Sequence, residues 1–449
     1  MDTDCFQPNC YRSTYYQRDW FLACRDARSY YSTPVAWELA GELDSGALTR
    51  ALEHLTLRHE ALRTAFRRHG ADDAEQVVRP LIAIDLHTVD LSDSPDPDAA
   101  VDDRIVAEAE RPRALDTAPL WHGLLFRLRP RRHVLALFIH HLVFDGWSHG
   151  VLHDELTRCY RAAAVARPPR LPDLRMQPGG YAQWERELRD PRGEAWWHDR
   201  LANLPPLSPI PHVGGRFVSY PIPEVPREAT TALGAMARSE GVGVNTALLA
   251  VLLAARRPLI GDDAVIGLTR AGRDRPELRR VIGPLLDHVP VRVDLSGRPT
   301  LRELLHRVQR AHHEAMAHQL PLGLIRQAVP DDLAPRGGRL YDTRYNFLPA
   351  GSAMSAVIVT ARGELRFTDR AMDPARLSPR HTEDHPEVLP LSYVLRQQRD
   401  GTVSGEICTH DGVYSAAQSQ RLAESFVATL QRAARDGAAR PLLTGQDAA

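Results

Sequence analysis

The sequence predicts an α/β protein of two similar-sized domains, and three observations lead to this prediction. The chain has 449 residues, which is more than one hydrophobic core usually serves. Helix-like and strand-like segments are mixed in both halves, without the regular alternation or the GxGxxG opening of a dinucleotide-binding fold. Residues 166–180 are rich in proline and glycine. We therefore place a linker there and expect domains at residues 1–175 and 176–449.

In the first half, leucines recur near helical spacing over residues 47–66, which predicts an amphipathic helix. The segment 121–141 reads as a β-hairpin, with Pro130 and its arginine neighbours in the turn. The remaining predicted elements here are a strand in 77–92 and helices in 101–115 and 151–164.

In the second half, residues 244–260 are almost entirely apolar, which predicts a buried helix. The other helices are expected in 181–190, 194–204, 226–241, 301–319 and 415–435. Strands are expected in 262–273, 288–295 and 340–349, and a hairpin in 386–412.

The charge balance excludes several functions. The 56 basic and 57 acidic residues give a formal charge of −1, so no global field attracts nucleic acid or a membrane. All the basic residues are arginine, because the sequence contains no lysine. This excludes Schiff-base and pyridoxal-phosphate mechanisms, and it excludes a phosphate-binding P-loop, since each requires a lysine.

The cysteines and the N-terminus predict a cytoplasmic protein. The cysteines are odd in number and scattered, without CxxC spacing, which favours free thiols: Cys5, Cys10, Cys24, Cys159 and Cys408. The first ten residues, MDTDCFQPNC, lack the basic and then apolar character of a signal peptide. No run of about 18 apolar residues occurs that would span a membrane.

The segment FIHHLVFDGWSHGVLHDEL, residues 138–156, is the strongest site candidate. Side chains alternate between the faces of a strand, so His140 and His141 are expected to face opposite sides. Asp145 and Gly146 fit a tight turn, and Ser148 can cap the helix that follows. The aspartate either orients the imidazole or holds the loop through an arginine, which leaves a histidine as the proton acceptor.

Three other interpretations stay open at this stage. Gly146–Gly150 spells GxSxG, the nucleophile elbow of serine hydrolases and thioesterases, although no HGG-type oxyanion segment precedes it. His149 and His153 have the i, i+4 spacing of metal ligands, but glycine replaces the glutamate of HExxH, so we expect no metal site. The motif also fits a non-catalytic domain that only docks partner proteins.

The central segment resembles the HHxxxDG signature of nonribosomal peptide synthetase condensation domains. Four further segments are similar to motifs of that family in the same order: residues 16–22 to AQxRLWFL, 58–66 to RHExLRTxF, 181–186 to YADYAxWQ, and 282–292 to IGxFVNTLPLR. The resemblance covers roughly residues 14–435. The heterocyclising variant DxxxxD is absent from this position, and no EGHGRE segment typical of epimerases is found.

The resemblance implies two chloramphenicol-acetyltransferase-like subdomains that form a V with a central tunnel. It implies an acyltransferase in which an amine or alcohol attacks an acyl or aminoacyl thioester held on the phosphopantetheine arm of a carrier protein. No cofactor is expected on the enzyme itself. The expected partners are this donor carrier and either a small-molecule acceptor or a second carrier, and we expect a free-standing monomer. Whether the product is an amide or an ester stays open.

The resemblance also implies the roles of individual residues. His141 is expected to be catalytic, and His140 and Asp145 to support the loop. Arg292 is expected to form the salt bridge with Asp145, and Gly146 to line the tunnel. The further tunnel candidates are Trp147, Ser148, Asp287, His288 and Asn346. Asp287 and His288 replace uncharged residues of the family's FVNT segment, which predicts unusual recognition there.

Overall fold

The computed structural model describes residues 9–24, 28–29, 32–207, 217–329, 333, 336, 338–349, 354–370, 372 and 389–440. The chain divides into two compact units. Unit 1 comprises residues 1–188, 271–286 and 352–386, and unit 2 comprises residues 189–270, 287–351 and 387–449. The sequence predicted two contiguous domains, whereas two later segments return to unit 1. One of them returns because its strand Gly363–Asp369 pairs with Ser32–Gly41.

The main sheet of unit 1 has six strands in the order β14-β15-β3-β9-β8-β6. Their bounds are β14 Ser355–Thr360, β15 Gly363–Asp369, β3 Ser32–Gly41, β9 Arg132–His140, β8 Trp121–Arg129 and β6 Leu86–Asp90. Smaller sheets are formed by β1 Cys10–Arg12, β5 Asp73–Val78 and β4 Thr64–His69, and by β2 Arg28–Ser29 and β7 Arg113–Ala114. The predicted hairpin of residues 121–141 is therefore confirmed as β8 and β9.

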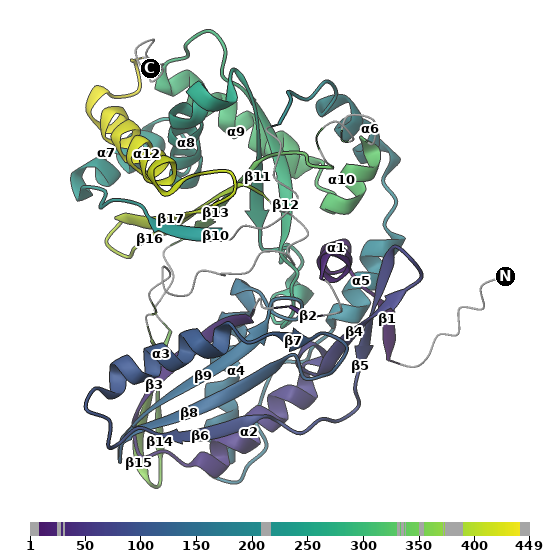
Figure 1. The fold of residues 1–449 in the computed structure, drawn as a ribbon, viewed down its shortest axis with the longest axis vertical. Coiled ribbons are helices and arrows are strands. Elements are labelled where there is room, and N and C mark those ends of the chain that lie inside the picture. Colours follow the sequence, from purple (N-terminus) through teal and green to yellow (C-terminus); the bar gives the residue numbers. More distant parts are fainter. Residues whose placement is uncertain are drawn as a thin grey trace, which may run out of the picture. The chain divides into compact units, whose positions relative to one another are not determined.

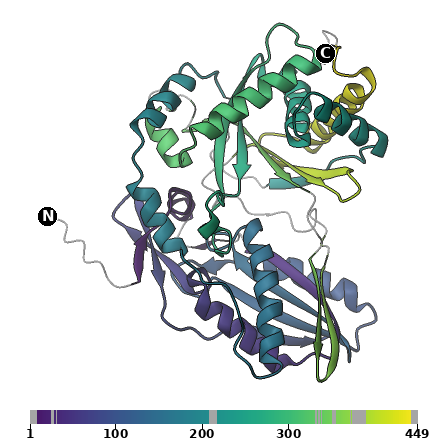
Figure 2. The same cartoon turned by 180° about the vertical axis from the view of Figure 1, so that it is seen from behind.

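Helices cover both faces of this sheet (Figures 1 and 2). The helices of unit 1 are α1 Tyr15–Ala23, α2 Ser45–Arg58, α3 Pro97–Ala109, α4 Gly146–Ala163 and α5 Pro178–Glu187. Along β9, Leu135, Leu137 and Ile139 enter the larger core cluster, which also contains residues of α2 and α4. Val134, Ala136 and Phe138 enter a separate cluster with α3. The predicted alternation of β9 is confirmed.

Unit 2 is built on a second six-stranded sheet, in the order β10-β17-β16-β13-β11-β12. Its strands are β10 Phe217–Pro221, β17 Val403–His410, β16 Leu391–Gln397, β13 Thr343–Leu348, β11 Asp263–Arg270 and β12 Asp287–Asp294. Its helices are α6 Pro191–Arg200, α7 Arg227–Ser239, α8 Val244–Ile260, α9 Leu301–Ala317, α10 Leu322–Ala328 and α12 Ala416–Asp436. Helices α7, α8, α9 and α12 pack against one another and the sheet (Figure 1).

Some predicted elements differ from the observed ones. The buried helix predicted over residues 244–260 has the bounds of α8. The helix predicted over 47–66 was too long, because α2 ends at Arg58 and is followed by a 3-10 turn, Glu60–Arg63, and strand β4. The hydrophobic pattern continues across this boundary because β4 also buries its first residues. Strands β14 and β15 were not predicted.

Two further predictions concern membranes and thiols. Among the described residues, no single helix is long and apolar enough to span a membrane, although the bent pair α7 and α8 meets the criterion jointly. Within the same part of the chain, the cysteines at 10, 24, 159 and 408 form no disulfide. Cys5 lies outside the described residues.

Candidate active site

The two adjacent histidines stand at the end of β9, in unit 1, and their surroundings differ. His140 is the last residue of the strand and is fully buried. Burial lowers the pKa of His140 to about 3, helped by the neighbouring His141 and Arg113. At physiological pH His140 is therefore neutral.

His141 follows the strand and is only partly buried. Its ring stacks on the indole of Trp20, with 5.2 Å between ring centroids and 26° between planes. Tyr16 lies on α1 one turn earlier, with its ring centroid 6.4 Å from that of His141. Trp20 is almost completely buried, so the indole is a fixed surface against which the imidazole is held.

The peptide after His141 is held from both sides. Gln17 of α1 donates from Nε2 to the carbonyl of Leu142 at 3.0 Å. The N–H of Leu142 donates to Nδ1 of His140 at 3.1 Å. Because Nδ1 of the neutral His140 accepts, its proton resides on Nε2. His140 thus acts as a fixed acceptor that shapes the loop, which supports its predicted supporting role.

Helix α1 is the part of this arrangement that residue-level reasoning missed. The segment 16–22 entered the prediction only through its family resemblance. The signal was present, because Tyr16 and Trp20 are four residues apart and therefore lie on one helical face. A glutamine among those aromatic residues, Gln17, is the kind of residue that can hydrogen-bond a loop.

Asp145 ends the loop and is 2% exposed. It is the N-cap of α4, and its Oδ1 accepts from the N–H of Ser148 at 2.9 Å and from the hydroxyl at 2.7 Å. Both terminal nitrogens of Arg273 donate to it, at 2.8 and 3.1 Å. The N–H groups of Leu285 and Leu286 donate to Oδ2 at 3.1 and 3.3 Å. The carboxylate therefore fastens residues 271–286 to the start of α4.

The predicted salt bridge between Arg292 and Asp145 is wrong. Arg292 lies on β12 and forms a bidentate pair with Asp263 on the neighbouring strand, at 2.8 and 2.6 Å. Its remaining donors contact the carbonyls of Arg200, Ala202 and Asn203. Since its five donors face these acceptors, Arg292 is hydrogen-bonded within unit 2. Arg273 forms the salt bridge with Asp145 that the resemblance assigned to Arg292.

Ser148 belongs to the helix and is not positioned as a nucleophile. It is fully buried in the first turn of α4, where Asp145, not Ser148, is the capping residue. Its Oγ contacts Asp145 and accepts from the N–H of Gly283 at 3.0 Å. The prediction that Ser148 caps the helix was therefore wrong. Its hydroxyl is used inside unit 1, and its place beside the substrate tunnel stays a prediction.

Gly146 and Trp147 border open space. A Cβ built on Gly146 would meet no atom within 4 Å. Trp147 is 45% exposed, and its indole N–H donates to the carbonyl of Arg279 at 2.9 Å. These two positions are accessible on unit 1, and their contact with a substrate remains a prediction.

The other tunnel candidates lie in unit 2. Asp287 is buried, accepts from the N–H groups of His288 and Leu322 at 2.8 and 3.1 Å, and lies 3.6 Å from Arg270. Burial raises the pKa of the Asp287 carboxyl. His288 is 1% exposed. Asn346 occupies β13 and pairs with Val394. Whether any of them contacts substrate stays a prediction.

His149 and His153, at the i, i+4 positions of α4, lie beside an indole and a single carboxylate. Nε2 of His149 lies 3.6 Å from Oδ1 of Asp369, and burial lowers the pKa of His149. The rings of His149 and His153 both lie near Trp37, at centroid distances of 5.5 and 6.1 Å. Over the described part of the chain, no group of three or more histidine, cysteine or acidic side chains is arranged to hold a metal ion.

Comparison with known sequences gives a consistent family assignment. The family model described as "Condensation domain" matches residues 8–441. Chondramide synthase of Chondromyces crocatus is 36% identical over 71% of this chain, which spans 8% of that protein. The phosphinothricin tripeptide synthetase PhsC of Streptomyces viridochromogenes is 30% identical over 95% of this chain, which spans 40% of its length. The chain thus corresponds to less than half of these relatives.

Solved structures share the same fold. The X-domain from teicoplanin biosynthesis superposes with a TM-score of 0.78 and 24% identity, covering 97% of both chains. The SgcC5 protein of Streptomyces globisporus gives a TM-score of 0.77 and 22% identity, covering 95% of this chain and 99% of the other. These similarities establish the α/β architecture with its two acetyltransferase-like halves, as predicted.

Proposed function

The chain belongs to the condensation-domain family of acyltransferases, and we propose that its own reaction joins an amine or alcohol to a carrier-bound acyl or aminoacyl thioester. Members of this family form amide or ester bonds in nonribosomal natural-product biosynthesis. The relatives of this chain include peptide synthetases, in agreement with such a role. The observation that carries the proposal is the position of His141, held by α1 at the end of β9.

The reaction requires few chemical groups. The nitrogen or oxygen of the acceptor attacks the thioester carbon, the carbon–sulfur bond breaks, and the acceptor's proton is transferred so that the sulfur can leave as a thiol. The imidazole of His141 is the proton carrier that the loop presents. Proton transfer by a positioned side chain contributes about 10²- to 10⁴-fold to such a rate. No acyl-enzyme intermediate is needed.

The residues around His141 support a role in alignment as well as proton transfer. Trp20 fixes one face of the imidazole, and Gln17 and His140 fix the peptide of Leu142 that follows it. Asp145 then fixes the end of the loop. A reacting group that is held in place before the substrate binds avoids a later entropic cost.

The proposed partner is a carrier protein whose phosphopantetheine arm presents the donor, with no cofactor held by the enzyme itself. The family acts on such carrier-bound substrates. The acceptor is proposed to be a small amine or alcohol, or a second carrier-bound aminoacyl group.

The structure disfavours the alternative of a serine hydrolase. Ser148 is fully buried and hydrogen-bonded to Asp145 and Gly283, so its oxygen is not presented to an ester. A fluorophosphonate probe is therefore expected not to label it. A non-catalytic docking domain would bind the carrier protein without using His141 for catalysis. Measurement of acyl transfer distinguishes this alternative from the proposed enzyme.

The test is a transfer assay followed by intact mass spectrometry. A carrier protein loaded with an acyl group is mixed with the purified enzyme and a panel of amines, alcohols and aminoacyl carriers. Loss of the acyl mass from the carrier together with an acylated acceptor supports the proposal, and the acceptor identifies an amide or an ester. Release of free acid without acceptor dependence would indicate a thioesterase. Carrier binding without transfer across the panel would indicate a docking domain.

A further inference from the structure

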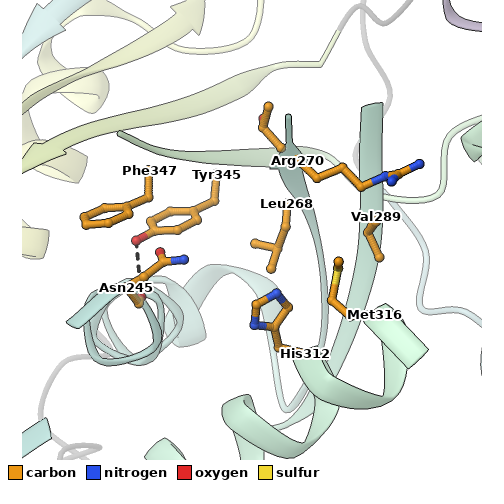
Figure 3. A pocket seen from close by; sticks show the side chains of 9 residues that line it. Asn245, Leu268, Arg270, Val289, His312, Met316, Tyr345 and Phe347 are labelled. Carbon is orange, nitrogen blue, oxygen red and sulfur yellow. Dashed lines mark hydrogen bonds between the residues drawn. The ribbon is translucent and has the colours of Figure 1, made fainter. Parts of the chain in front are cut away.

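Unit 2 contains a small cavity that plays no part in the chemistry proposed above (Figure 3). It lies between strands β11, β12 and β13 and helices α8 and α9. Its lining residues are Asn245, Leu268, Thr269, Arg270, Val289, His312, Met316, Tyr345 and Phe347. The space open to the centre of a water molecule is about 60 Å³. That is room for on the order of four water molecules, or for one short organic group.

Two polar atoms of the cavity lining are buried without a partner. Oδ1 of Asn245 and Oγ1 of Thr269 have no hydrogen-bond partner among the described residues. Figure 3 shows the side chains of Asn245 and His312 projecting from the two helices toward the strands. Buried polar atoms of folded proteins are normally satisfied by the protein, by water or by a ligand. A bound group with an N–H or O–H donor would satisfy them.

The charges around the cavity favour a neutral occupant. Burial lowers the pKa of His312, so this imidazole is uncharged at physiological pH. Arg270 lies 3.6 Å from the carboxylate of Asp287 and donates to Gln319 at 3.2 Å, so its charge is offset. The buried Tyr345 hydroxyl donates to the carbonyl of Asn245 at 3.3 Å, and burial raises its pKa. A cationic occupant would meet Arg270 as a like charge, and an anionic one would have to compete with Asp287 for it, so either would lose its hydration without a free counter-charge.

The remaining walls are apolar. Leu268, Val289, Met316 and the ring of Phe347 complete the lining. The occupant that fits this lining therefore has a short apolar body. A methionine in the wall suits such a role, because its flexible thioether adapts to irregular shapes.

We propose that this cavity binds a short neutral group with an apolar body and a hydroxyl or primary amide end, and that this group is the side chain of a substrate. The second clause rests on the proposed function. Only Ala271 and Gly272 separate Arg270 of the cavity from Arg273, which holds Asp145 at the end of the His141 loop. The chain thus joins the cavity lining directly to the segment that supports the candidate active site.

Binding is tested without any catalytic step. The protein has six methionines, and one of them, Met316, lines the cavity. Its ¹³C-labelled methyl resonance, assigned with Met316→Leu, reports on titration with isobutyramide and with the charged analogues isobutyrate and isobutylammonium. We expect saturable shifts with isobutyramide at concentrations about 10-fold lower than with either analogue, because the analogues must be desolvated as ions. The resonances of Met176 and Met354, in unit 1, should stay unchanged.

Matched variants locate the binding site. Asn245→Leu removes the amide at nearly constant size, and since its Oδ1 has no partner, the variant is expected to fold. It should weaken isobutyramide about 5- to 10-fold, the effect of one hydrogen bond. His312→Leu should also weaken it, whereas His313→Leu, at the exposed neighbouring position on α9, should not. No shift of Met316, equal affinities for the three probes, or equal effects of the two histidine variants would overturn the site.

The role of the bound group is tested separately with the transfer assay. We expect the wild-type enzyme to prefer acceptors or donors with a hydroxyl or amide side chain over purely aliphatic ones. In Asn245→Leu this preference should fall about 5- to 10-fold. If Met316 responds to isobutyramide but no transfer is found, the site stands and the proposed function fails. If transfer is found with unaltered preference, the cavity is not a substrate site.

Discussion

Each unit buries an aspartate beside an arginine, and the two pairs differ in how completely the carboxylate is hydrogen-bonded. Asp145 receives both terminal nitrogens of Arg273, three backbone N–H groups and a hydroxyl, all within 3.3 Å. Asp287 receives two backbone N–H groups, and Arg270 is 3.6 Å away. Correspondingly, burial raises the pKa of Asp287.

Of the two carboxylates, Asp145 is the structural anchor. A buried charge is tolerated when its lone pairs are satisfied by donors of good geometry. Asp145 meets this condition, and its partners come from the start of α4 and from the segment 271–286, so it fixes the end of the loop that carries His141. Asp287 meets it only in part, and its charge is a local cost within unit 2.

The largest expected effect comes from removing the partner of Asp145. Arg273→Met should lower the free energy of unfolding by about 3–5 kcal/mol, because it leaves a buried carboxylate without its counter-charge. Arg292→Met is the matched control. It breaks a pair whose acid, Asp263, is 43% exposed, and should cost about 1–2 kcal/mol. Urea unfolding of the three proteins measures both values, and equal losses would contradict the assignment of Arg273.

This pair also shows what the sequence could and could not predict. The HHxxxDG spacing and the strand alternation located the loop and separated His140 from His141 without any coordinates. They could not identify the arginine, because Arg273 and Arg292 are both distant from Asp145 in sequence. That choice depends on how residues 271–286 return to unit 1. Because of the same return, the two units are discontinuous in sequence, and a single linker at residues 166–180 does not separate them.

A second effect concerns acid stability in unit 1. His140 has a pKa of about 3 in the folded protein because it is buried, against an ordinary value near 6.5. The unfolded chain binds the proton first, so stability is retained above pH 6.5 and is lost as the pH falls toward 3. The loss is about 1.4 kcal/mol per pH unit, or about 2 kcal/mol at pH 5.

The control for this effect is a variant that cannot titrate. His140→Leu should not lose stability through this titration. The difference in the free energy of unfolding between wild type and His140→Leu should therefore narrow by about 2 kcal/mol between pH 6.5 and 5. His87→Leu, at an exposed position, should leave the slope as in the wild type. A gap that stays constant with pH would mean that His140 does not titrate as its burial requires.

A third, smaller effect tests the support from α1. Gln17→Leu removes the hydrogen bond to the Leu142 carbonyl and frees the peptide next to His141. We expect the rate of acyl transfer to fall about 10-fold with little change in KM for the acceptor, because alignment is lost and not binding. Gln183→Leu changes an exposed glutamine on α5 and serves as the control. A rise in KM alone would assign Gln17 to substrate binding.

The smallest effect is the pH dependence of Asp287. The pKa of Asp287 is higher in the folded than in the unfolded chain because the carboxyl is buried. Its contribution to the free energy of unfolding is therefore fully present below the pKa of the unfolded chain, and it is lost as the pH rises through the pKa of the folded protein. Asp287→Asn removes the titration, so its stability relative to wild type should improve from pH 4 to pH 7. A relative stability that worsens over this range would show that Arg270 compensates the charge better than the 3.6 Å separation suggests.

We propose that the loop fixed by Asp145 presents His141 to the reacting groups. Single-turnover transfer from a loaded carrier protein, measured for wild type, His141→Ala and His87→Ala, tests it directly. A loss of about 10²- to 10⁴-fold in His141→Ala is predicted, with His87→Ala close to wild type. Transfer by His141→Ala within about 3-fold of wild type would contradict the claim, since a proton-transfer group contributes far more than that.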